Sequence, residues 1–380
     1  MKIGIVTILK VNNYGAELQA YATQEALCRM GYDAEIIDYL FYKNSGHIAD
    51  AESKPSYKLP LSVRFKEWAF PKVTALRTML SGAPKGTRDA RFDRFHTENT
   101  RMSRTYRSYG ELKRAVPEYD VYLSGSDQVW NPFTYTSLDP YFLNFAPPTA
   151  RRVAYASSFG VGEIPEYAKA FYCSRLNKYH AIGVREDAAV RLVKELSGKD
   201  AQQVLDPTFL LDSDAWSSLA SKSEIDLPEG YILVYELIPC QYINQLAQHI
   251  SKATGRKIVR IGRSAADVGQ CDISVADAGP IEFLRLFQNA GVVITNSFHG
   301  TAFSINFNKD FYTVLPLKKK NNSRQRSVLK MFGLENRLLV EGDAIPPIDH
   351  LTIDYVPVNE ILRSQRQRSI DFLKTAIDGN

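Results

Sequence analysis

The chain has 380 residues, of which 44% are hydrophobic and 23% are charged, so it can bury two cores and we expect two domains. No stretch reaches the ~18 consecutive apolar residues of a membrane span, and the apolar start Ile3–Leu9 is too short for a signal peptide. The four cysteines contain no CxxC pair, which argues against a structural zinc site, an iron–sulfur cluster and a disulfide framework. We therefore expect a cytoplasmic protein.

The first domain is predicted to open with a βαβ unit. Strand-like residues Lys2–Thr7 precede a helical pattern over Gly15–Met30, and a second strand follows at Ala34–Tyr39. The next predicted elements are strands at Val121–Leu123, Val153–Ala156 and His180–Arg185, and a helix at about Glu186–Leu196. The domain should end near Leu211, and we interpret Asp206-Pro207 as part of a linker.

A basic segment interrupts this domain. The net charge is +5, yet residues 54–114 contain 15 Lys or Arg against 5 Asp or Glu, a local +10 that leaves −5 for the rest. Leu61–Leu80 has an amphipathic helical pattern bent at Pro71, and we predict a basic helical insertion over about 54–114. Such a segment suits an acidic polymer, a nucleic acid or an anionic membrane surface, and a solvated helical face is the simpler alternative.

A second α/β unit is predicted from Tyr231 onward. Its elements are strands at Tyr231–Tyr235, Lys257–Ile261, Val292–Ile294 and Tyr312–Leu315, and helices at Gln241–Thr254, Ile281–Ala290, from Ser297, and through Met331. The predicted fold class is α/β, with two Rossmann-like doubly wound domains facing across a cleft in a GT-B-like arrangement. We expect residues 1–211 and 212–356 as the domains, and 357–380 as a helix that returns to the first domain.

One histidine lies in a motif of the kind that often carries catalytic residues in α/β proteins. In VVITNSFHGTAFSINF, residues 292–307, an apolar strand ends at Ile294 and Ser297 is a good N-cap for the helix that follows. His299 is thereby placed on a strand-to-helix turn, where a helix start offers backbone N–H groups to an anion. The alternative is a helix-start histidine that only forms a structural hydrogen bond.

Five motifs, in this order and spacing, give the chain a wider resemblance. They are NNYGAELQAYA at 12–22, GSDQVWNP at 125–132, YASSFG at 155–160, VREDAA with LDPTFLL at 184–211, and TNSFHGTAFSINF followed by NNSR at 295–324. The sequence resembles the polysaccharide pyruvyl transferase family. The resemblance implies transfer of an enolpyruvyl-derived group from phosphoenolpyruvate onto a sugar, closure of a cyclic ketal across two hydroxyls, and release of phosphate.

The resemblance also implies a setting for the reaction. The acceptor would be a sugar of a capsule or exopolysaccharide precursor, carried on a lipid diphosphate at the cytoplasmic leaflet. The basic segment could then dock peripherally on an anionic membrane surface. Phosphoenolpyruvate is a co-substrate, and we expect no metal and no further cofactor.

Several donor-site residues follow from the resemblance. His299 matches the catalytic histidine, to which we assign general acid work on the phosphate or its bridging oxygen. Arg185, Ser297, Phe298, Lys320 and Arg324 are predicted to bind phosphoenolpyruvate, although some relatives carry an arginine where this chain has Ser297. Arg185 could instead pair with Glu186 or Asp187 at a helix start, and Lys318–Lys320 could be a solvated loop.

The acceptor side is predicted in the first domain. In GSDQVWNP, Asp127 is the best carboxylate for taking a proton from a sugar hydroxyl, and Gln128 and Trp130 are candidate sugar contacts. Asn13 and Tyr14 are further candidates at a strand-to-helix turn. The structural alternatives are a tight turn with Trp130 in the core, and Asn13 as a plain N-cap.

Two other functions compete with this hypothesis. A GT-B glycosyltransferase using a nucleotide sugar would need an acidic ribose-binding residue in the second domain, where only Asp272 and Asp277 are candidates. A nucleic-acid-binding protein would rest on the basic segment alone, because no recognised binding module is present. We expect no nucleic-acid partner, and the sequence does not decide the oligomeric state.

Overall fold

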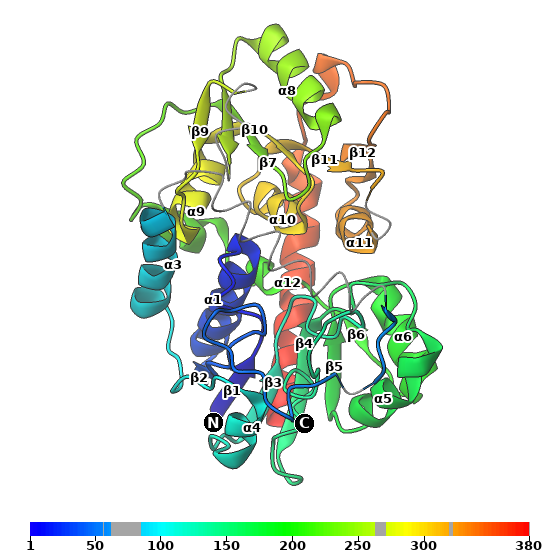
Figure 1. Cartoon of the computed structure of the whole chain (residues 1–380). Coiled ribbons are helices and arrows are strands. Elements are labelled where there is room, and N and C mark those ends of the chain that lie inside the picture. Colours follow the sequence, from blue (N-terminus) through cyan, green and yellow to red (C-terminus); the bar gives the residue numbers. More distant parts are fainter. Residues whose placement is uncertain (56, 62–84, 263–270, 319–321, 380) are drawn as a thin grey trace. The chain divides into compact units, whose positions relative to one another are not determined.

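The computed structural model describes residues 1–55, 57–61, 85–262, 271–318 and 322–379 (Figure 1). These form two compact units. The first holds the described parts of 1–76, 96–210 and 365–380, and the second holds those of 77–95 and 211–364. The amphipathic stretch predicted at Leu61–Leu80 lies almost wholly outside the described residues, as does Lys320.

The first unit contains a parallel sheet with the order β2-β1-β3-β4-β5-β6 (Figure 1). Its strands are β1 (Lys2–Val6), β2 (Asp33–Ile36), β3 (Val121–Ser124), β4 (Arg151–Ser157), β5 (Ala181–Val184) and β6 (Gln202–Gln203). Its helices are α1 (Tyr14–Arg29), α4 (Tyr109–Arg114), α5 (Glu166–Leu176), α6 (Asp187–Ser197), the 3-10 turn η1 (Pro207–Phe209) and the end of α12 (Tyr355–Asp378). Because the strands are parallel, the loops that follow them meet at one edge of the sheet.

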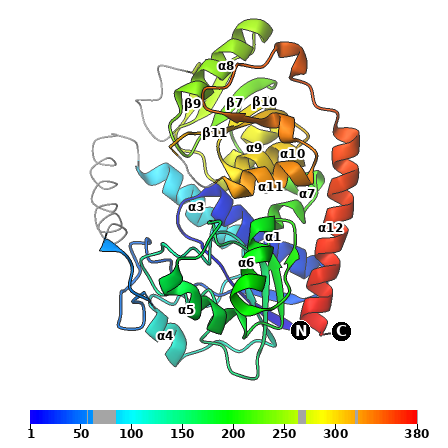
Figure 2. The same cartoon turned by 90° about the vertical axis from the view of Figure 1, so that its right-hand side faces the viewer.

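Helices cover both faces of this sheet (Figure 2). On one face, Tyr172 of α5 and Leu192 of α6 belong to a buried core that includes Ala154 of β4. The next side chain of β4, Tyr155, points to the opposite face, where it lies beside Phe372 of α12. There the Phe372 ring packs on Gly183 of β5, which has no Cβ to occupy the same space.

The described part of the basic segment contains two helices and a stretch that pairs with the first sheet. Helix α3 (Lys85–Asn99) begins in the second unit and ends in the first, and residues 96–114 cluster with the first unit. Between α3 and α4, Met102 and Tyr106 form parallel bridges with Ile36 and Tyr39, so this stretch extends the sheet beside β2. A charge count does not detect such pairing, because it is made through the backbone beside the buried Tyr106 side chain.

The second unit contains a parallel sheet with the order β12-β11-β10-β7-β8-β9. Its strands are β7 (Tyr231–Tyr235), β8 (Ile258–Ile261), β9 (Ile273–Val275), β10 (Ala290–Thr295), β11 (Asp310–Leu315) and β12 (Leu338–Val340). Its helices are α7 (Ser213–Ala220), α8 (Gln241–Thr254), α9 (Pro280–Asn289), α10 (Phe298–Asn306), α11 (Ser323–Met331), and the 3-10 turns Glu335–Arg337 and Ile348–His350.

Alternation along β7 separates the two faces of this second sheet. Ile232 and Val234 belong to the core under α8, whereas Tyr235 packs edge-on against Phe283 of α9 on the other face. Phe303 of α10 contacts Phe283 as well, so α9 and α10 cover the same face. The sheet is thereby buried on both sides, so the residues that can contact a ligand lie in the loops at the ends of its strands.

Candidate functional site

The turn between β10 and α10 is built by short-range hydrogen bonds. The Ser297 hydroxyl accepts a hydrogen bond from the Gly300 N–H at 3.3 Å, which is the N-cap predicted from the sequence. The Thr295 hydroxyl accepts from the Ser297 N–H at 3.1 Å and donates to the Tyr235 carbonyl at 2.6 Å. A Cβ at Gly300 would lie 2.3 Å from the Thr295 hydroxyl oxygen, so only glycine fits there.

His299 is the second residue of α10, at the carboxyl end of a central strand, and its predicted place on a strand-to-helix turn is confirmed. Its side chain is buried beside the Phe298 ring, with the ring centroids 5.2 Å apart in an edge-on arrangement. An imidazole in this position can exchange a proton next to the positive end of the helix dipole.

A network of amides fixes the surroundings of this turn. The Asn296 side chain accepts from the Leu237 N–H at 2.7 Å and donates to the Ile238 carbonyl at 2.6 Å, tying the loop after β7 to the turn. The Gln325 side chain of α11 donates to the Asn296 carbonyl at 3.3 Å. The N-termini of α10 and α11 are thereby held together.

Arg324 occupies the first turn of α11, where it is partly buried. That turn contains no acidic residue, and the N-cap Asn322 makes no side-chain capping bond. A cation at a helix N-terminus opposes the helix dipole unless an anion binds nearby. Arg324 and the start of α11 together are therefore suited to an anionic ligand.

An arginine that the sequence analysis did not select lies two strands from His299 in the same sheet. Arg260 of β8 forms a buried ion pair with Glu236, which follows β7, at 2.6 Å, and donates to the Asn244 side chain of α8. The feature of the sequence that could have identified Arg260 is its position as a charged residue within the apolar strand Ile258–Ile261. Because Glu236 already neutralises it, Arg260 holds the loop after β7 in place.

Arg185 stands in a cluster of three carboxylates at the carboxyl edge of the first sheet. Its guanidinium lies 2.8 Å from Asp206, 3.7 Å from Asp127 and 3.9 Å from Glu186. Burial disfavours the charged form, but the three carboxylates outweigh burial and raise the pKa of Arg185. The ion pair with Glu186 that we considered is present, and the shortest contact is to a residue we had placed in a linker.

Asp206 is therefore corrected from a linker residue to a member of this cluster. Its other contacts are to the Ser126 hydroxyl at 3.0 Å and to the Thr208 N–H and hydroxyl at 3.0 and 2.8 Å, which cap η1. Glu186 accepts a hydrogen bond from the Ser158 hydroxyl at 2.7 Å. Four strands, β3 to β6, thus contribute polar residues at their carboxyl ends.

Asp127 has the accessible carboxylate of the cluster. Its side chain is 17% exposed, whereas the carboxylates of Glu186 and Asp206 are wholly buried. Its backbone is left-handed at φ 72°, an uncommon and costly conformation for a non-glycine residue. Next to it, Gln128 accepts a hydrogen bond from Asn131 and packs against Gly160, where a Cβ would meet its side chain at 2.1 Å.

Trp130 does not fit the predicted acceptor contact. Its side chain is fully buried, its ring stacks on Phe142 at 5.0 Å between centroids, and its indole N–H donates to the Tyr141 carbonyl at 3.3 Å. The structure thus shows the alternative considered for this motif, a turn with the Trp130 ring in the core. We remove Trp130 from the candidate site.

Asn13 and Tyr14 open α1 at the same edge of the sheet. The Asn13 side chain accepts from the Ala16 N–H at 3.3 Å, so its N-cap role is real and leaves its amide N–H2 for other contacts. Tyr14 is buried. One turn later, the buried Glu17 lies 3.3 Å from the His96 imidazole, a pair that the helical pattern alone did not reveal.

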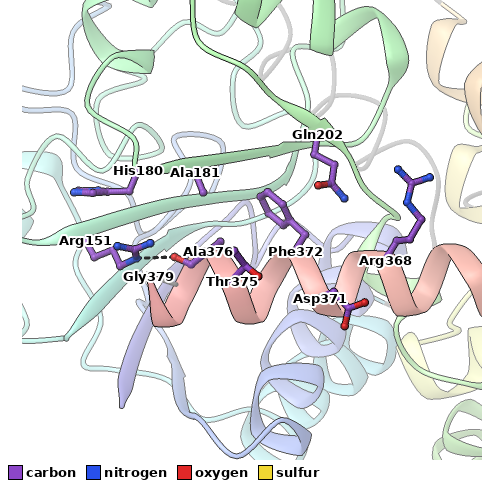
Figure 3. Close-up of a pocket in the computed structure, with 10 residues that line it drawn as sticks. All are labelled: Arg151, His180, Ala181, Gln202, Arg368, Asp371, Phe372, Thr375, Ala376 and Gly379. Atoms are coloured by element: carbon purple, nitrogen blue, oxygen red, sulfur yellow. Dashed lines mark hydrogen bonds between the residues drawn. The ribbon is translucent and has the colours of Figure 1, made fainter.

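A cavity of about 520 Å³ lies at the opposite edge of the first sheet (Figure 3). Arg151 and Ala181, the first residues of β4 and β5, line it together with Phe372, Thr375 and other residues of α12. Arg151 donates to the Ala376 carbonyl at 2.6 Å and so binds the end of that helix. The cavity is remote along the strands from Asp127 and Arg185, and we do not assign it to the candidate site.

Two general features of the described residues bear on the site. No group of three or more His, Cys, Asp or Glu side chains within them is arranged to hold a metal ion. None of the helices in this part of the chain has the length and apolar character needed to cross a membrane.

Comparisons with solved structures identify the fold. A protein of Listeria monocytogenes taken to be a UDP-N-acetylglucosamine 2-epimerase superposes with a TM-score of 0.55 at 9% identity, covering 100% of this chain and 97% of that one. The Methanocaldococcus jannaschii UDP-GlcNAc 2-epimerase gives 0.49 at 12% identity over 96% and 92%, and an Escherichia coli heptosyltransferase 0.41 at 11% over 97% and 100%. With its two parallel sheets, the chain has the two-domain Rossmann-like GT-B fold.

Comparison at the level of sequence identifies the family. No curated protein matches the chain. The family described as polysaccharide pyruvyl transferase matches residues 13–316, which include the motifs on which the resemblance rested apart from Asn12 and the whole of NNSR at 321–324. The chain belongs to the polysaccharide pyruvyl transferase family, and it is a transferase.

Proposed function

We propose that the protein uses phosphoenolpyruvate to form a cyclic pyruvate ketal on a sugar of a capsule or exopolysaccharide precursor. The observation that carries the proposal is the pairing of two helix starts in the second unit, α10 with His299 and α11 with Arg324, tied through Asn296 and Gln325. Phosphoenolpyruvate carries a phosphate and a carboxylate, and helix N-termini with a cation are suited to both.

The donor contacts are assigned within the second unit. The N-terminal turn of α10, with Ser297 and Phe298, faces the phosphate through backbone N–H groups, and Arg324 supplies positive charge. This arrangement offsets the absence of an arginine at position 297. Lys320, outside the described residues, remains a proposed second cation.

The acceptor is assigned to the first unit, where Asp127 is the proposed general base. Asn13, Tyr14 and Gln128 are the proposed neighbours of the sugar ring. Arg185 holds Asp127 in place from 3.7 Å, so we now give it this positioning role in preference to the donor contact first predicted. A cluster with three carboxylates and one guanidinium favours a neutral sugar over a further anion.

The proposed reaction conserves protons. Carbon 3 of phosphoenolpyruvate gains a proton, and carbon 2 is attacked by one sugar hydroxyl, whose proton passes to Asp127. His299 protonates the phosphate as the bond between carbon 2 and its bridging oxygen breaks. The second hydroxyl then attacks carbon 2 and loses its proton. The two protons given up by the hydroxyls equal the two taken by carbon 3 and by phosphate.

The acceptor class is proposed to be a lipid-diphosphate-linked saccharide. The basic composition of residues 54–114 supports docking on an anionic membrane surface, where each cation contributes roughly 1 kcal/mol. Liposome sedimentation at low and high salt tests this part, because 1 M salt shortens the Debye length to about 3 Å. An absence of binding at low salt would remove the membrane from the proposal.

The main experiment measures phosphate release from phosphoenolpyruvate with a panel of lipid-linked and soluble galactosides, mannosides and glucosides. His299→Gln should lower turnover by roughly 10²–10⁴-fold, the usual range for a lost general acid, while donor binding persists. His249→Gln, an exposed histidine on α8, is the matched control. Turnover with UDP-sugars and none with phosphoenolpyruvate would instead support the glycosyltransferase alternative.

A further inference from the structure

The loop between β1 and α1 is held in an unusual backbone conformation. Lys10 and Asn12 both have left-handed φ angles, 55° and 50°, although neither is glycine. Each such residue is costly, so the surrounding contacts must fix the loop. The loop leads directly into Asn13 and Tyr14, the residues assigned to the acceptor.

Glu17 makes the contacts that fix this loop. From the first turn of α1, its two carboxylate oxygens accept hydrogen bonds from the Val11 N–H at 3.1 Å and from the Lys10 N–H at 3.3 Å. The side chain is wholly buried. A buried carboxylate that receives backbone N–H bonds acts as a clamp on the loop, and these bonds are stronger when the carboxylate is ionised.

The titratable and charged groups placed around Glu17 within the described residues are His96 of α3, Lys10 of the loop and Asp38 after β2. His96 Nε2 lies 3.3 Å from the Glu17 carboxylate, and the Lys10 ammonium lies 2.5 Å from Asp38. Burial raises the pKa of Glu17 to about 7, against the loop hydrogen bonds and Lys10, which lower it. Burial also lowers the pKa of His96 to about 4, so a single proton resides on the pair in weakly acidic solution.

The loop is also connected to the carboxylate cluster. The Thr7 hydroxyl donates to the Ser126 carbonyl at 2.9 Å and accepts from the Gln19 side chain at 2.9 Å. The Ser126 hydroxyl in turn donates to Asp206, the partner of Arg185. The loop is therefore linked through hydrogen bonds to the carboxylate cluster that contains Asp127, the proposed base.

We propose that Glu17, with His96, is a positioning residue for acceptor binding: its carboxylate clamps the Lys10–Asn13 loop through two backbone N–H groups, and loss of its proton tightens the clamp. This inference rests on the proposed function for its kinetic consequence. Ionised, Glu17 accepts charge-assisted bonds from the loop. Protonated, it donates to His96 and holds the loop less firmly.

The kinetic test uses Glu17→Gln, which keeps the shape of the side chain and removes its titration. In the wild type, the KM for the sugar acceptor should fall about fivefold between pH 6 and pH 8, as one neutral bond becomes charge-assisted. In Glu17→Gln it should stay at the high value throughout, with calorimetric affinity for phosphoenolpyruvate unchanged. Glu25→Gln, on the outer face of the same helix, should behave as the wild type.

Hydrogen exchange tests the clamp without turnover. Protection factors at the Lys10 and Val11 amides should fall about fivefold in Glu17→Gln relative to Glu25→Gln at pH 8, and amides of β7 should be unaffected. Unchanged protection and an unchanged acceptor KM would overturn the proposal, as would a parallel loss of donor affinity. If the wild type shows no transfer at all, the proposed function fails, and hydrogen exchange alone decides whether Glu17 clamps the loop.

Discussion

Removal of the Arg185 side chain should destabilise the first unit severely. The guanidinium is 2% exposed and is surrounded by Asp206, Glu186 and Asp127 at 2.8, 3.9 and 3.7 Å. Arg185→Met would leave two wholly buried carboxylates without a counter-charge, and loss of one partner of a buried ion pair costs roughly 3–5 kcal/mol. Asp206→Asn should cost less, because the guanidinium keeps its other two partners. The double variant should fall short of additivity by roughly 0.5–3 kcal/mol.

The assay must report on the first unit alone, since a two-unit chain need not unfold in one step. Native-state hydrogen exchange of the amides in β3 and β4 gives that free energy. The control is the exposed pair of Glu25 and Arg29 on α1, where Arg29→Met should cost roughly 0.3–0.5 kcal/mol. If Arg185→Met costs less than about 1 kcal/mol, the guanidinium is not held among three carboxylates and the reasoning fails.

Three further predictions concern single positions. Gly300→Ala should abolish transfer and reduce phosphoenolpyruvate affinity in calorimetry, because its Cβ would meet the Thr295 hydroxyl at 2.3 Å and displace the start of α10. Trp130→Ala should cost roughly 3–5 kcal/mol by urea unfolding, since the ring is fully buried, while a fold that survives should still bind acceptor. The pKa of Glu17 is raised from 4.5 to about 7, so Glu17 contributes stability that is present below pH 4.5 and is lost as the pH rises to about 7. The pKa of His96 is lowered from 6.5 to about 4, so His96 contributes stability that is present above pH 6.5 and is lost as the pH falls to about 4. These two dependences of stability on pH oppose each other between about pH 4.5 and 6.5, so the free energy of unfolding of the wild type should be nearly constant there. In denaturant titrations, the free energy of unfolding of Glu17→Gln should rise with pH in this range, because only His96 still contributes. A constant free energy in the variant would exclude the pair.

Elements with strong local patterns could be predicted from the sequence, and those fixed by distant contacts could not. The buried strand Tyr231–Tyr235 and the amphipathic helix Gln241–Thr254 were predicted with the bounds they have, because a short apolar run and a 3.6-residue period are local properties. The parallel bridge of Tyr106 with Tyr39 joins residues far apart in the chain, and no local pattern around either residue indicates it.

The same distinction applies to the candidate site. His299 and its N-cap Ser297 were predicted because strand, cap and helix follow one another within a few residues. Asp206 was missed since a residue before proline favours a turn, and its pairing with Arg185 depends on β5 and β6 being neighbours. Glu17 was missed because a glutamate in a helix normally faces water, and its contact with His96 joins residues far apart in the chain.

The charges of the two units favour donor binding in the second unit and acceptor binding in the first. Phosphoenolpyruvate would meet two helix N-termini and Arg324 in the second unit, where negative charge is stabilised and the nearby Glu236 is already neutralised by Arg260. In the first unit, a fourth anionic group beside Asp127, Glu186 and Asp206 would be repelled by carboxylates that a single guanidinium does not balance. A sugar hydroxyl is neutral and must lose a proton, which the Asp127 carboxylate is proposed to receive. The electrostatics therefore favour the proposed assignment of the anionic substrate to His299 and of the neutral one to Asp127, and donor binding at the Arg185 charge cluster would contradict that proposal.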